Sequence, residues 1–306
     1  MNGRKGLDYS IYKSICIKHK SEYAENQMLM QYTSFKIGGN CPLLMKPNSA
    51  ECLCELMAEF ERNNERYKVM GKGSNLLISD NGVDCPVILI SSDLGKVVFH
   101  GDEVICQAGM PLISLCKEVA KIGLSGLEFA YGIPGSVGGA VYMNAGAYGG
   151  EMKDIVKSCT YADEKGILHS MERDEMDLSY RHSFFSGKPY VIVDVTLKLK
   201  NGDKKAITEK MQELMSKRIE KQPLEYPSAG STFKRPKGDF AGRLIESAGM
   251  KGFTFGGAQV SEKHCGFVIN KSNASFNDVI SVIKTVKTRV KETSGKDLEC
   301  EVIIWE

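Results

Sequence analysis

The sequence lacks long hydrophobic runs, an excess of charge of one sign, and a clustered cysteine motif. Its longest apolar stretches, such as VILI at residues 87–90, are far too short to span a membrane. The N-terminal residues contain no apolar segment of the signal-peptide type. The net charge is only +2, whereas a nucleic-acid-binding protein typically has a strong excess of basic residues. We therefore expect a cytoplasmic protein with no membrane insertion and no nucleic-acid partner.

The spacing of the cysteines argues against a zinc site and against a redox dithiol. Ten are scattered along the chain, and the only close pair is Cys52 and Cys54, with one residue between them. A zinc site or a redox dithiol usually contains two cysteines separated by two residues, a spacing that does not occur here. We expect free and mostly buried thiols in a reducing compartment, and no metal site.

What the sequence does have is glycine, concentrated in residues 131–151. This segment reads YGIPGSVGGAVYMNAGAYGGE and contains seven glycines. So much glycine destabilises a helix and weakens a strand. We interpret the segment as backbone that turns sharply and lets a ligand approach, because bare N–H groups suit a phosphate or a flat polar ring system. A buried turn that only packs closely is the alternative.

A second glycine-containing loop, GKGSN at residues 71–75, lies within a predicted strand-and-loop segment at 67–77. It is not a Rossmann fingerprint, because Leu76 replaces the third glycine and a strand-like segment follows instead of a helix. It also lacks the GK[ST] triplet of a Walker motif. Taken alone, a hairpin turn and a phosphate site are equally good interpretations. The presence of the 131–151 segment favours the phosphate site.

The remaining pattern predicts a mixed α+β fold in which antiparallel pairing dominates. Average globular composition and a length of 306 residues are compatible with two or three domains. Apolar periodicity and capping signals predict helices at 8–30, 49–61, 111–123, 204–218, 240–248 and 276–290. Alternating patterns predict strands or hairpins at 87–91, 96–108, 155–171, 190–199, 267–270 and 300–305.

Three polar segments could carry chemistry: SYRHS with Arg181, AGSTFKR with Ser231, and LECEV with Glu301. They do not form a hydrolase triad, because no base is paired with the serine. An arginine, a serine and a glutamate do suit binding of a substrate carboxylate and delivery of a proton near it. Surface salt bridges for Arg181 and Glu301, and a cap or turn for Ser231, are the alternatives. We predict that His264 is structural and not catalytic.

Six motifs in order resemble one protein family: GKGSN, YGIPGSVGGAVYMNAGAYGGE, SYR, PSAGSTFKRP, GRLIESAG and LECEV. They resemble the UDP-N-acetylenolpyruvoylglucosamine reductases, flavoenzymes that make UDP-N-acetylmuramate for peptidoglycan. The resemblance extends from about residue 31 to the C-terminus, and the missing insertion between Ser183 and Tyr190 is similar to the shorter, second type of the family. Two departures are IIWE at the end, where a glycine commonly follows the strand, and Cys265-Gly266, where Ala-Asn is commoner.

This resemblance implies a two-subdomain FAD-binding module of the vanillyl-alcohol-oxidase type and a C-terminal α+β substrate-binding domain. The implied divisions are an N-terminal helical extension at 1–30, FAD subdomains at 31–95 and 96–202, and the substrate domain at 203–306. It further implies noncovalent FAD, NADPH as co-substrate, a UDP-sugar substrate, and a monomer or weak homo-oligomer. A flavin oxidase with covalent FAD and a non-catalytic nucleotide-binding module are the alternatives; the 131–151 segment contains no histidine or cysteine for a covalent link.

The resemblance also implies roles for single residues. Arg181 and Glu301 would hold and polarise the substrate carboxylate, and Ser231 would protonate C2 after hydride transfer from FAD N5 to C3. The implied cofactor-binding residues are Gly71, Lys72, Gly73, Ser74, Asn75, Leu76, Gly135, Ser136, Gly138, Gly139, Asn144, Ala145 and Gly146. The implied substrate-binding residues are Tyr180, Lys217, Arg218, Arg235 and Gln259, of which the basic ones would bind the UDP phosphates.

Overall fold

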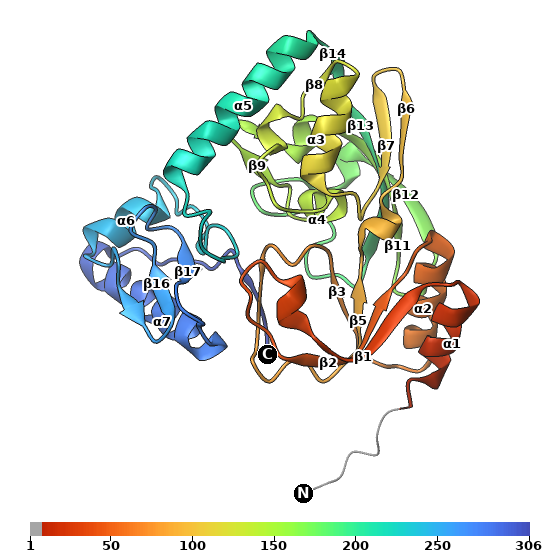
Figure 1. The fold of residues 1–306 in the computed structure, drawn as a ribbon, viewed down its shortest axis with the longest axis horizontal. Coiled ribbons are helices and arrows are strands. Elements are labelled where there is room, and N and C mark those ends of the chain that lie inside the picture. The colour runs from red at the N-terminus through yellow and green to blue at the C-terminus, as the bar shows by residue number, and fades with distance from the viewer. Residues whose placement is uncertain (1–7) are drawn as a thin grey trace, which may run out of the picture.

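The computed structural model describes residues 8–306, which form three packed bodies (Figure 1). The helices are α1 (Ser10–Lys18), α2 (Ala50–Arg62), α3 (Leu112–Lys121), α4 (Val137–Tyr142), α5 (Lys204–Lys221), α6 (Ala241–Ser247) and α7 (Phe276–Ser294). The strands are β1 (Glu22–Met28), β2 (Asn40–Lys46), β3 (Lys68–Met70), β4 (Leu76–Ile78), β5 (Val87–Leu89), β6 (Val97–His100), β7 (Glu103–Gln107), β8 (Leu124–Ser125), β9 (Gly146–Ala147), β10 (Gly150–Glu151), β11 (Val156–Ala162), β12 (Leu168–Glu172), β13 (Val191–Lys198), β14 (Lys200–Asn201), β15 (Thr254–Phe255), β16 (Ala258–Val260), β17 (Val268–Asn270) and β18 (Ile303–Trp305). This mixture, with mostly antiparallel pairing, confirms the α+β prediction.

The first body contains a four-stranded sheet in the order β1-β2-β5-β3, with α1 and α2 beside it (Figure 1). Here the prediction of one helix over 8–30 is wrong beyond Lys18. Lys20 has φ +54, a left-handed conformation that ends the helix, and the Asn48 amide holds this turn through the carbonyl oxygens of His19 and Lys20, each at 3.1 Å. The following polar residues become the edge strand β1, which pairs antiparallel with β2. The part of the predicted extension that falls on residues 1–7 lies outside the described residues.

The second body is a five-stranded antiparallel sheet in the order β12-β11-β13-β7-β6, and the hairpins predicted at 96–108 and 155–171 are confirmed. Within the glycine-rich segment, the expectation that glycine would exclude a helix is wrong, because α4 forms there. The Ser136 hydroxyl accepts a hydrogen bond from the Gly139 N–H and so caps α4. A Cβ at Gly138 would lie 2.6 Å from the Ala108 Cβ, so glycine lets α4 pack directly on the end of β7.

The third body contains α6, β15–β17 and α7, and α5 connects it to the second body (Figure 1). Its hydrophobic core also includes Phe35, Ile37 and Leu77 of the first body. The chain then leaves this body, and β18 pairs in parallel with β4. Trp305 is buried in the same hydrophobic cluster as Leu29 and Met70 of the first body. The sequence pattern predicted a terminal strand but not its partner. The pairing of β18 with β4 holds the preceding residues, 299–302, between the bodies.

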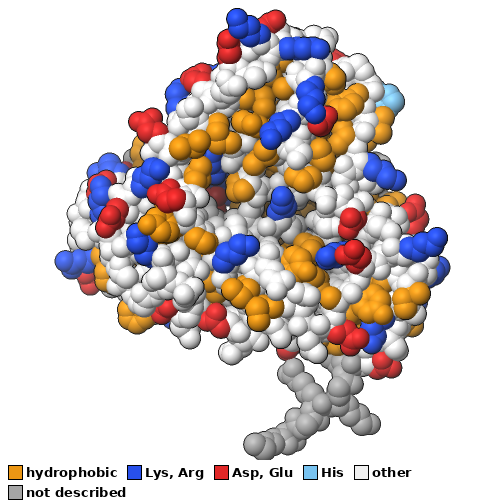
Figure 2. Space-filling view, in the orientation of Figure 1, with side chains coloured by type: hydrophobic (Ala, Val, Ile, Leu, Met, Phe, Trp, Pro, Cys, Tyr) orange, Lys and Arg blue, Asp and Glu red, His pale blue; other side chains and the backbone are white. Residues whose placement is uncertain are grey.

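The ten cysteines are all free, eight of them buried and two half-buried, as predicted. In the part of the chain that the structure describes, none of the helices is long and apolar enough to cross a membrane. On the face shown in Figure 2, acidic and basic side chains are interspersed. This face therefore carries no large patch of one charge.

Candidate functional site

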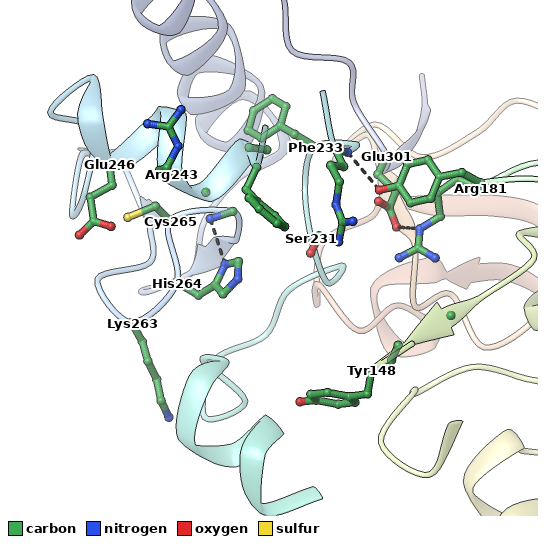
Figure 3. Close-up of a pocket in the computed structure, with 18 of the residues that line it drawn as sticks. Tyr148, Arg181, Ser231, Phe233, Arg243, Glu246, Lys263, His264, Cys265 and Glu301 are labelled. Atoms are coloured by element: carbon green, nitrogen blue, oxygen red, sulfur yellow. Dashed lines mark hydrogen bonds and ion pairs between the residues drawn. The ribbon is translucent and has the colours of Figure 1, made fainter. Parts of the chain in front are cut away.

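A cavity of ≈ 700 Å³ lies where the bodies meet. Arg181, Ser231 and Glu301, which are far apart in the sequence, all line it. Figure 3 shows Arg181 and Glu301 facing each other at one side, with Ser231 between them and His264. The structure thus brings the three predicted catalytic residues into one pocket.

Backbone pairing places Ser231 beside Glu301. The Glu301 N–H donates to the Thr232 carbonyl at 2.9 Å, and the Lys234 N–H donates to the Glu299 carbonyl at 2.8 Å. Thr232 is fully buried, and its hydroxyl accepts a hydrogen bond from the Val268 N–H at 2.9 Å. The backbone on both sides of Ser231 is therefore fixed. The Ser231 hydroxyl itself makes no hydrogen bond to any of residues 8–306, and it faces the cavity.

Arg181 and Glu301 form a largely buried ion pair. The Arg181 Nε donates to the Glu301 Oε1 at 2.5 Å, and the two side chains are only 20% and 11% exposed. Burial raises the pKa of Glu301, and the Arg181 charge opposes this shift. Arg181 has φ +55, a costly conformation for a residue with a side chain. The strained backbone aims the guanidinium at Glu301 and into the pocket.

Two asparagines that the resemblance assigned to cofactor binding also hold the segments that carry the predicted catalytic residues. Asn144 is buried, and its amide donates to the Ser179 carbonyl at 3.0 Å and to Glu151 at 2.6 Å, while its carbonyl accepts from the Lys153 N–H. The Asn75 amide donates to the Glu301 carbonyl at 3.0 Å. Both side-chain NH2 groups thus hold protein backbone, and the role of these two residues in cofactor binding stays a prediction.

The two glycine-containing loops face each other, as their joint interpretation required. A Cβ at Gly71 would lie 2.8 Å from the Ser136 Oγ, and the nearest atom to a Cβ at Gly135 would be the Ser74 Oγ at 3.8 Å. At Gly139 a Cβ would meet only the Ser136 Oγ, at 3.4 Å, and otherwise open space. The loops form a cradle that added side chains would fill. Such a surface fits a flat group bearing phosphates, as FAD does.

Of the five predicted substrate residues, Tyr180 and Arg235 line the cavity and the other three, Lys217, Arg218 and Gln259, do not. The Tyr180 hydroxyl accepts a hydrogen bond from the Arg235 N–H at 3.0 Å. Lys217 pairs with Glu213 on the surface of α5, and the Gln259 amide donates to Thr254 Oγ1; neither residue lines the cavity. Arg218 is partly buried against Gly132, and burial lowers its pKa.

Sequence reasoning missed several cavity residues. Tyr148, Arg243 and Cys265 line the pocket, and so does His264, which was predicted to be structural. Tyr148 and Arg243 lie inside the motifs YGIPGSVGGAVYMNAGAYGGE and GRLIESAG, so the motifs were the available signal. No periodicity or spacing marked Cys265 or His264 as pocket residues.

Comparison with known proteins assigns the family. Residues 222–305 match the model of the UDP-N-acetylenolpyruvoylglucosamine reductase C-terminal domain, and residues 42–172 match an FAD binding domain. A UDP-N-acetylenolpyruvoylglucosamine reductase of Clostridium botulinum (strain Okra / Type B1) is 44% identical over 96% of this chain and 97% of its own length. The chain belongs to the UDP-N-acetylenolpyruvoylglucosamine reductase family.

Two further reductases of this family are similar to the chain over nearly its whole length. The one from Clostridium novyi (strain NT) is 46% identical over 94% of both chains. The crystal structure of the UDP-N-acetylenolpyruvylglucosamine reductase from Thermus caldophilus superposes with a TM-score of 0.76 and is 36% identical, covering 94% of this chain and 99% of that one. The predictions of an FAD-dependent oxidoreductase of peptidoglycan precursor synthesis, with an FAD-binding module and a C-terminal family domain, are thereby confirmed.

Proposed function

We propose that this chain reduces the enolpyruvyl ether of UDP-N-acetylglucosamine enolpyruvate to the lactyl ether of UDP-N-acetylmuramate, in the cytoplasm, with NADPH as electron donor. One observation carries the proposal: a largely buried Arg181–Glu301 pair and a serine hydroxyl without a hydrogen-bond partner in residues 8–306 line a single cavity in a chain of this family. An enol ether that bears a carboxylate needs both a carboxylate-binding cation and a proton donor. The cavity offers each of them.

Noncovalent FAD is held by the two facing glycine loops in this proposal. When bound and reduced by NADPH, FAD supplies a hydride from N5 to C3 of the enol ether. Gly71 and Gly135 give the cofactor room, because a side chain at either position would occupy the space between the loops. The domain limits near 31–95, 96–202 and 203–306 stay part of the proposal, with β18 contributing to the first subdomain.

Arg181 stabilises the charge that develops as C3 gains a hydride. Negative charge then grows at C2 and spreads into the substrate carboxylate. A guanidinium offers a planar fork to that carboxylate, and Glu301 fixes the orientation of the fork through its contact with Nε. Because the charge exists mainly in the transition state, this contact lowers the barrier more than it tightens substrate binding.

Ser231 completes the reaction by giving its hydroxyl proton to C2. A serine hydroxyl is a very weak acid, so it donates only to a strongly basic centre such as this carbanion or enolate. The hydroxyl is not engaged elsewhere in residues 8–306, and Thr232 holds its backbone. The proton therefore arrives from a fixed position without the need for a histidine.

The diphosphate of the UDP-sugar has two candidate cations in the described part of the chain. Arg235 lines the cavity and stacks over Phe240 at 4.8 Å, and Arg218 is partly buried; neither makes an ion pair within residues 8–306. Free guanidinium groups suit phosphate oxygens. Lys217, Gln259 and Arg218 do not line the cavity, but Lys217 and Gln259 already have partners within the described residues, whereas Arg218 has no ion pair there. Arg235 and Arg218 therefore suit the diphosphate better than Lys217 and Gln259 do.

The deciding experiment separates the two half-reactions in Ser231→Ala. Anaerobic stopped-flow at the flavin band measures reduction by NADPH first, and reoxidation by the enolpyruvyl sugar nucleotide second. We expect normal reduction, and reoxidation slowed by about 10²–10⁴-fold because the C2 anion lacks its acid. Ser231→Cys should recover part of the rate, since a thiol also donates a proton. Unchanged reoxidation in Ser231→Ala would remove the serine from the mechanism, and a wild-type flavin that the sugar nucleotide does not reoxidise would overturn the function.

A further inference from the structure

The strand β6 forms one free edge of the five-stranded sheet, and its exposed side chains are mostly apolar (Figure 1). Val98 is 49% exposed, Phe99 is 38% exposed, and Ile105, which pairs with Val98 on β7, is 37% exposed. Natural edge strands are usually blocked by a charged side chain such as lysine, by a proline or by a bulge. Residues 97–100 read VVFH, with no Lys, Arg, Asp, Glu or Pro, and their register with β7 is continuous. This edge is therefore open to another strand.

The other edge strands of the two larger sheets are protected. In the four-stranded sheet, β1 carries Glu22 and Glu25, and β3 carries Lys68. At the opposite edge of the five-stranded sheet, β12 carries Glu172. A charged side chain on an edge opposes pairing with a second chain. Among the edges of these two sheets in residues 8–306, β6 alone lacks such a charge.

The backbone groups of β6 divide between its two sides. The Lys96 carbonyl accepts from the Gln107 N–H at 2.9 Å, so these two residues form a hydrogen-bonded pair. Hydrogen-bonded pairs alternate with non-bonded pairs along an antiparallel ladder, so Val98 also bonds to β7. The N–H and C=O groups of Val97 and Phe99 therefore point to the free edge, because β6 is the last strand of the sheet.

These free groups match those of a second copy of β6 that runs antiparallel to the first. When Phe99 lies opposite Phe99 of the copy, the two residues exchange two hydrogen bonds, and Val97 of each strand lies opposite Gly101 of the other. A Cβ at Gly101 would meet nothing within 4 Å, so the space beside that residue is open. Phe99 pairs with the fully buried Val104, so both Phe99 rings lie on the core-facing side of the sheet. They form an aromatic cross-strand pair, which stabilises antiparallel strands.

The same register is complementary in charge. Lys96 of each strand lies opposite Asp102 of the other. Lys96 makes no ion pair within the described residues, and the Asp102 carboxylate, which binds Lys198 at 2.7 Å, is still 38% exposed. A shift of the register by two residues would separate the two Phe99 rings and remove both ion pairs. The charges and the aromatic pair therefore favour the same register.

We propose that two copies of this chain associate through β6, with Phe99 opposite Phe99, so that their two five-stranded sheets become continuous. None of the residues that line the cavity belongs to β6 or β7. The contact uses a surface separate from the proposed catalytic site, and the inference does not depend on the proposed function. One pair of strands buries little area, so the dimer is weak and its population depends on concentration.

Sedimentation velocity of the FAD-loaded protein over a range of concentrations measures the dimer dissociation constant. In Phe99→Lys, two like charges face each other at the centre of the contact, and the dissociation constant should rise about 10-fold or more. Leu168→Lys is the matched control, because Leu168 is 48% exposed on β12, at the opposite edge of the same sheet. This control should associate as the wild type does. Flavin content and thermal unfolding of both variants should match the wild type, which shows that the fold is intact.

A charge exchange tests the register. Lys96→Glu places two carboxylates opposite each other, and Asp102→Lys places two ammonium groups opposite each other. Each variant alone should therefore associate about 3–10-fold more weakly than the wild type. An equal mixture of the two variants should recover association, because in the mixed dimer every acidic side chain again faces a basic one.

The outcomes are distinct. A wild-type protein that stays monomeric at the highest concentration would overturn the proposal, and so would a dimer that Phe99→Lys leaves intact. A dimer that Leu168→Lys weakens as much as Phe99→Lys does would show a general effect of added charge and would also overturn it. Failure of the mixed variants to associate would overturn the register in which Lys96 faces Asp102.

Discussion

The two glycine-containing loops and the proposed catalytic cluster differ in which feature of the chain matters for their proposed roles. In the loops at 71–76 and 135–146, the proposed role depends on the absence of side chains: a Cβ at Gly71 or Gly135 would lie between the two loops. In the cluster of Arg181, Ser231 and Glu301, the useful feature is the side chains themselves, brought together from three distant segments. The loops are continuous stretches of sequence, whereas the cluster exists only after the chain has folded.

The contrast shows which kind of site a sequence reveals. A loop whose role depends on the absence of side chains can be detected from local composition, as the seven glycines in residues 131–151 show. A cluster that works through distant contacts leaves only isolated polar residues, for which surface salt bridges and turns were equally good explanations. Variants can test whether the two regions are as different as this comparison states.

The largest effect is expected at two neighbouring glycines of α4. Gly139→Val places its side chain where a Cβ has only the Ser136 Oγ nearby, at 3.4 Å, so the protein should fold but exclude the flavin. Gly138→Ala places a methyl group 2.6 Å from the Ala108 Cβ, so it should strain the packing and still bind flavin. We expect colourless, inactive Gly139→Val and yellow, active Gly138→Ala that is destabilised by about 1–3 kcal/mol.

The visible spectrum of each purified variant and its thermal unfolding give the two readouts. A Gly139→Val protein with full flavin occupancy would show that this glycine does not face the cofactor. A Gly138→Ala protein that lost its flavin without losing stability would show that Gly138 also faces the cofactor and does not serve only to let α4 pack on Ala108.

The same contrast explains how far the sequence determined the fold. Helices with a regular apolar stripe were predicted well: α7 begins at Phe276, and Ser49 caps α2 as expected. The strand β1 was not predicted, because it is a polar edge strand without an alternating apolar pattern. The strand β18 was predicted, but its pairing with β4 was not, because more than two hundred residues separate the two strands. The short helix α4 was missed because glycine propensity argues against it, and packing on Ala108 overrides that propensity.

For the site, motifs found Arg181, Ser231 and Glu301, but only the structure shows how they are held. The left-handed backbone of Arg181 and the amide of Asn144 on the Ser179 carbonyl are tertiary features with no signal in spacing or composition. His264 illustrates the other limit. It was predicted to be structural, and its Nδ1 does accept from the Gly266 N–H, whereas its place in the wall of the cavity depends on tertiary packing.

A smaller effect is expected within the cluster, from Arg181→Lys. The charge is kept, but the planar fork and the Nε contact with Glu301 are lost. By analogy with other transition-state contacts, turnover should fall about 10²–10³-fold while flavin binding is unchanged. Rapid-mixing measurements should assign the loss to reoxidation by the sugar nucleotide. Near-native turnover would mean that charge alone suffices, and that the buried pair is structural.

The smallest effect should come from Asn75, which joins the two regions. Asn75 belongs to the first glycine-containing loop. Its side-chain amide donates to the Glu301 carbonyl at 3.0 Å, and its backbone carbonyl accepts from the Ile303 N–H at 3.0 Å. In Asn75→Ala the backbone contact with β18 remains, whereas the hydrogen bond to the Glu301 carbonyl is lost at a cost of about 0.5–1.5 kcal/mol, together with the longer contact of the same amide with the Met143 Sδ at 3.9 Å. Because that bond positions Glu301 and not the flavin, we expect reoxidation by the sugar nucleotide to slow by about 2–10-fold, a rate change of similar free energy. Flavin affinity should stay close to that of the wild type.

Tyr180→Phe, which removes the hydroxyl that accepts from the Arg235 N–H, is the matched control for loss of one hydrogen bond at the cavity rim. If Asn75→Ala released flavin and left reoxidation unchanged, Asn75 would belong to the cofactor cradle, and the two regions would not be joined through its side chain.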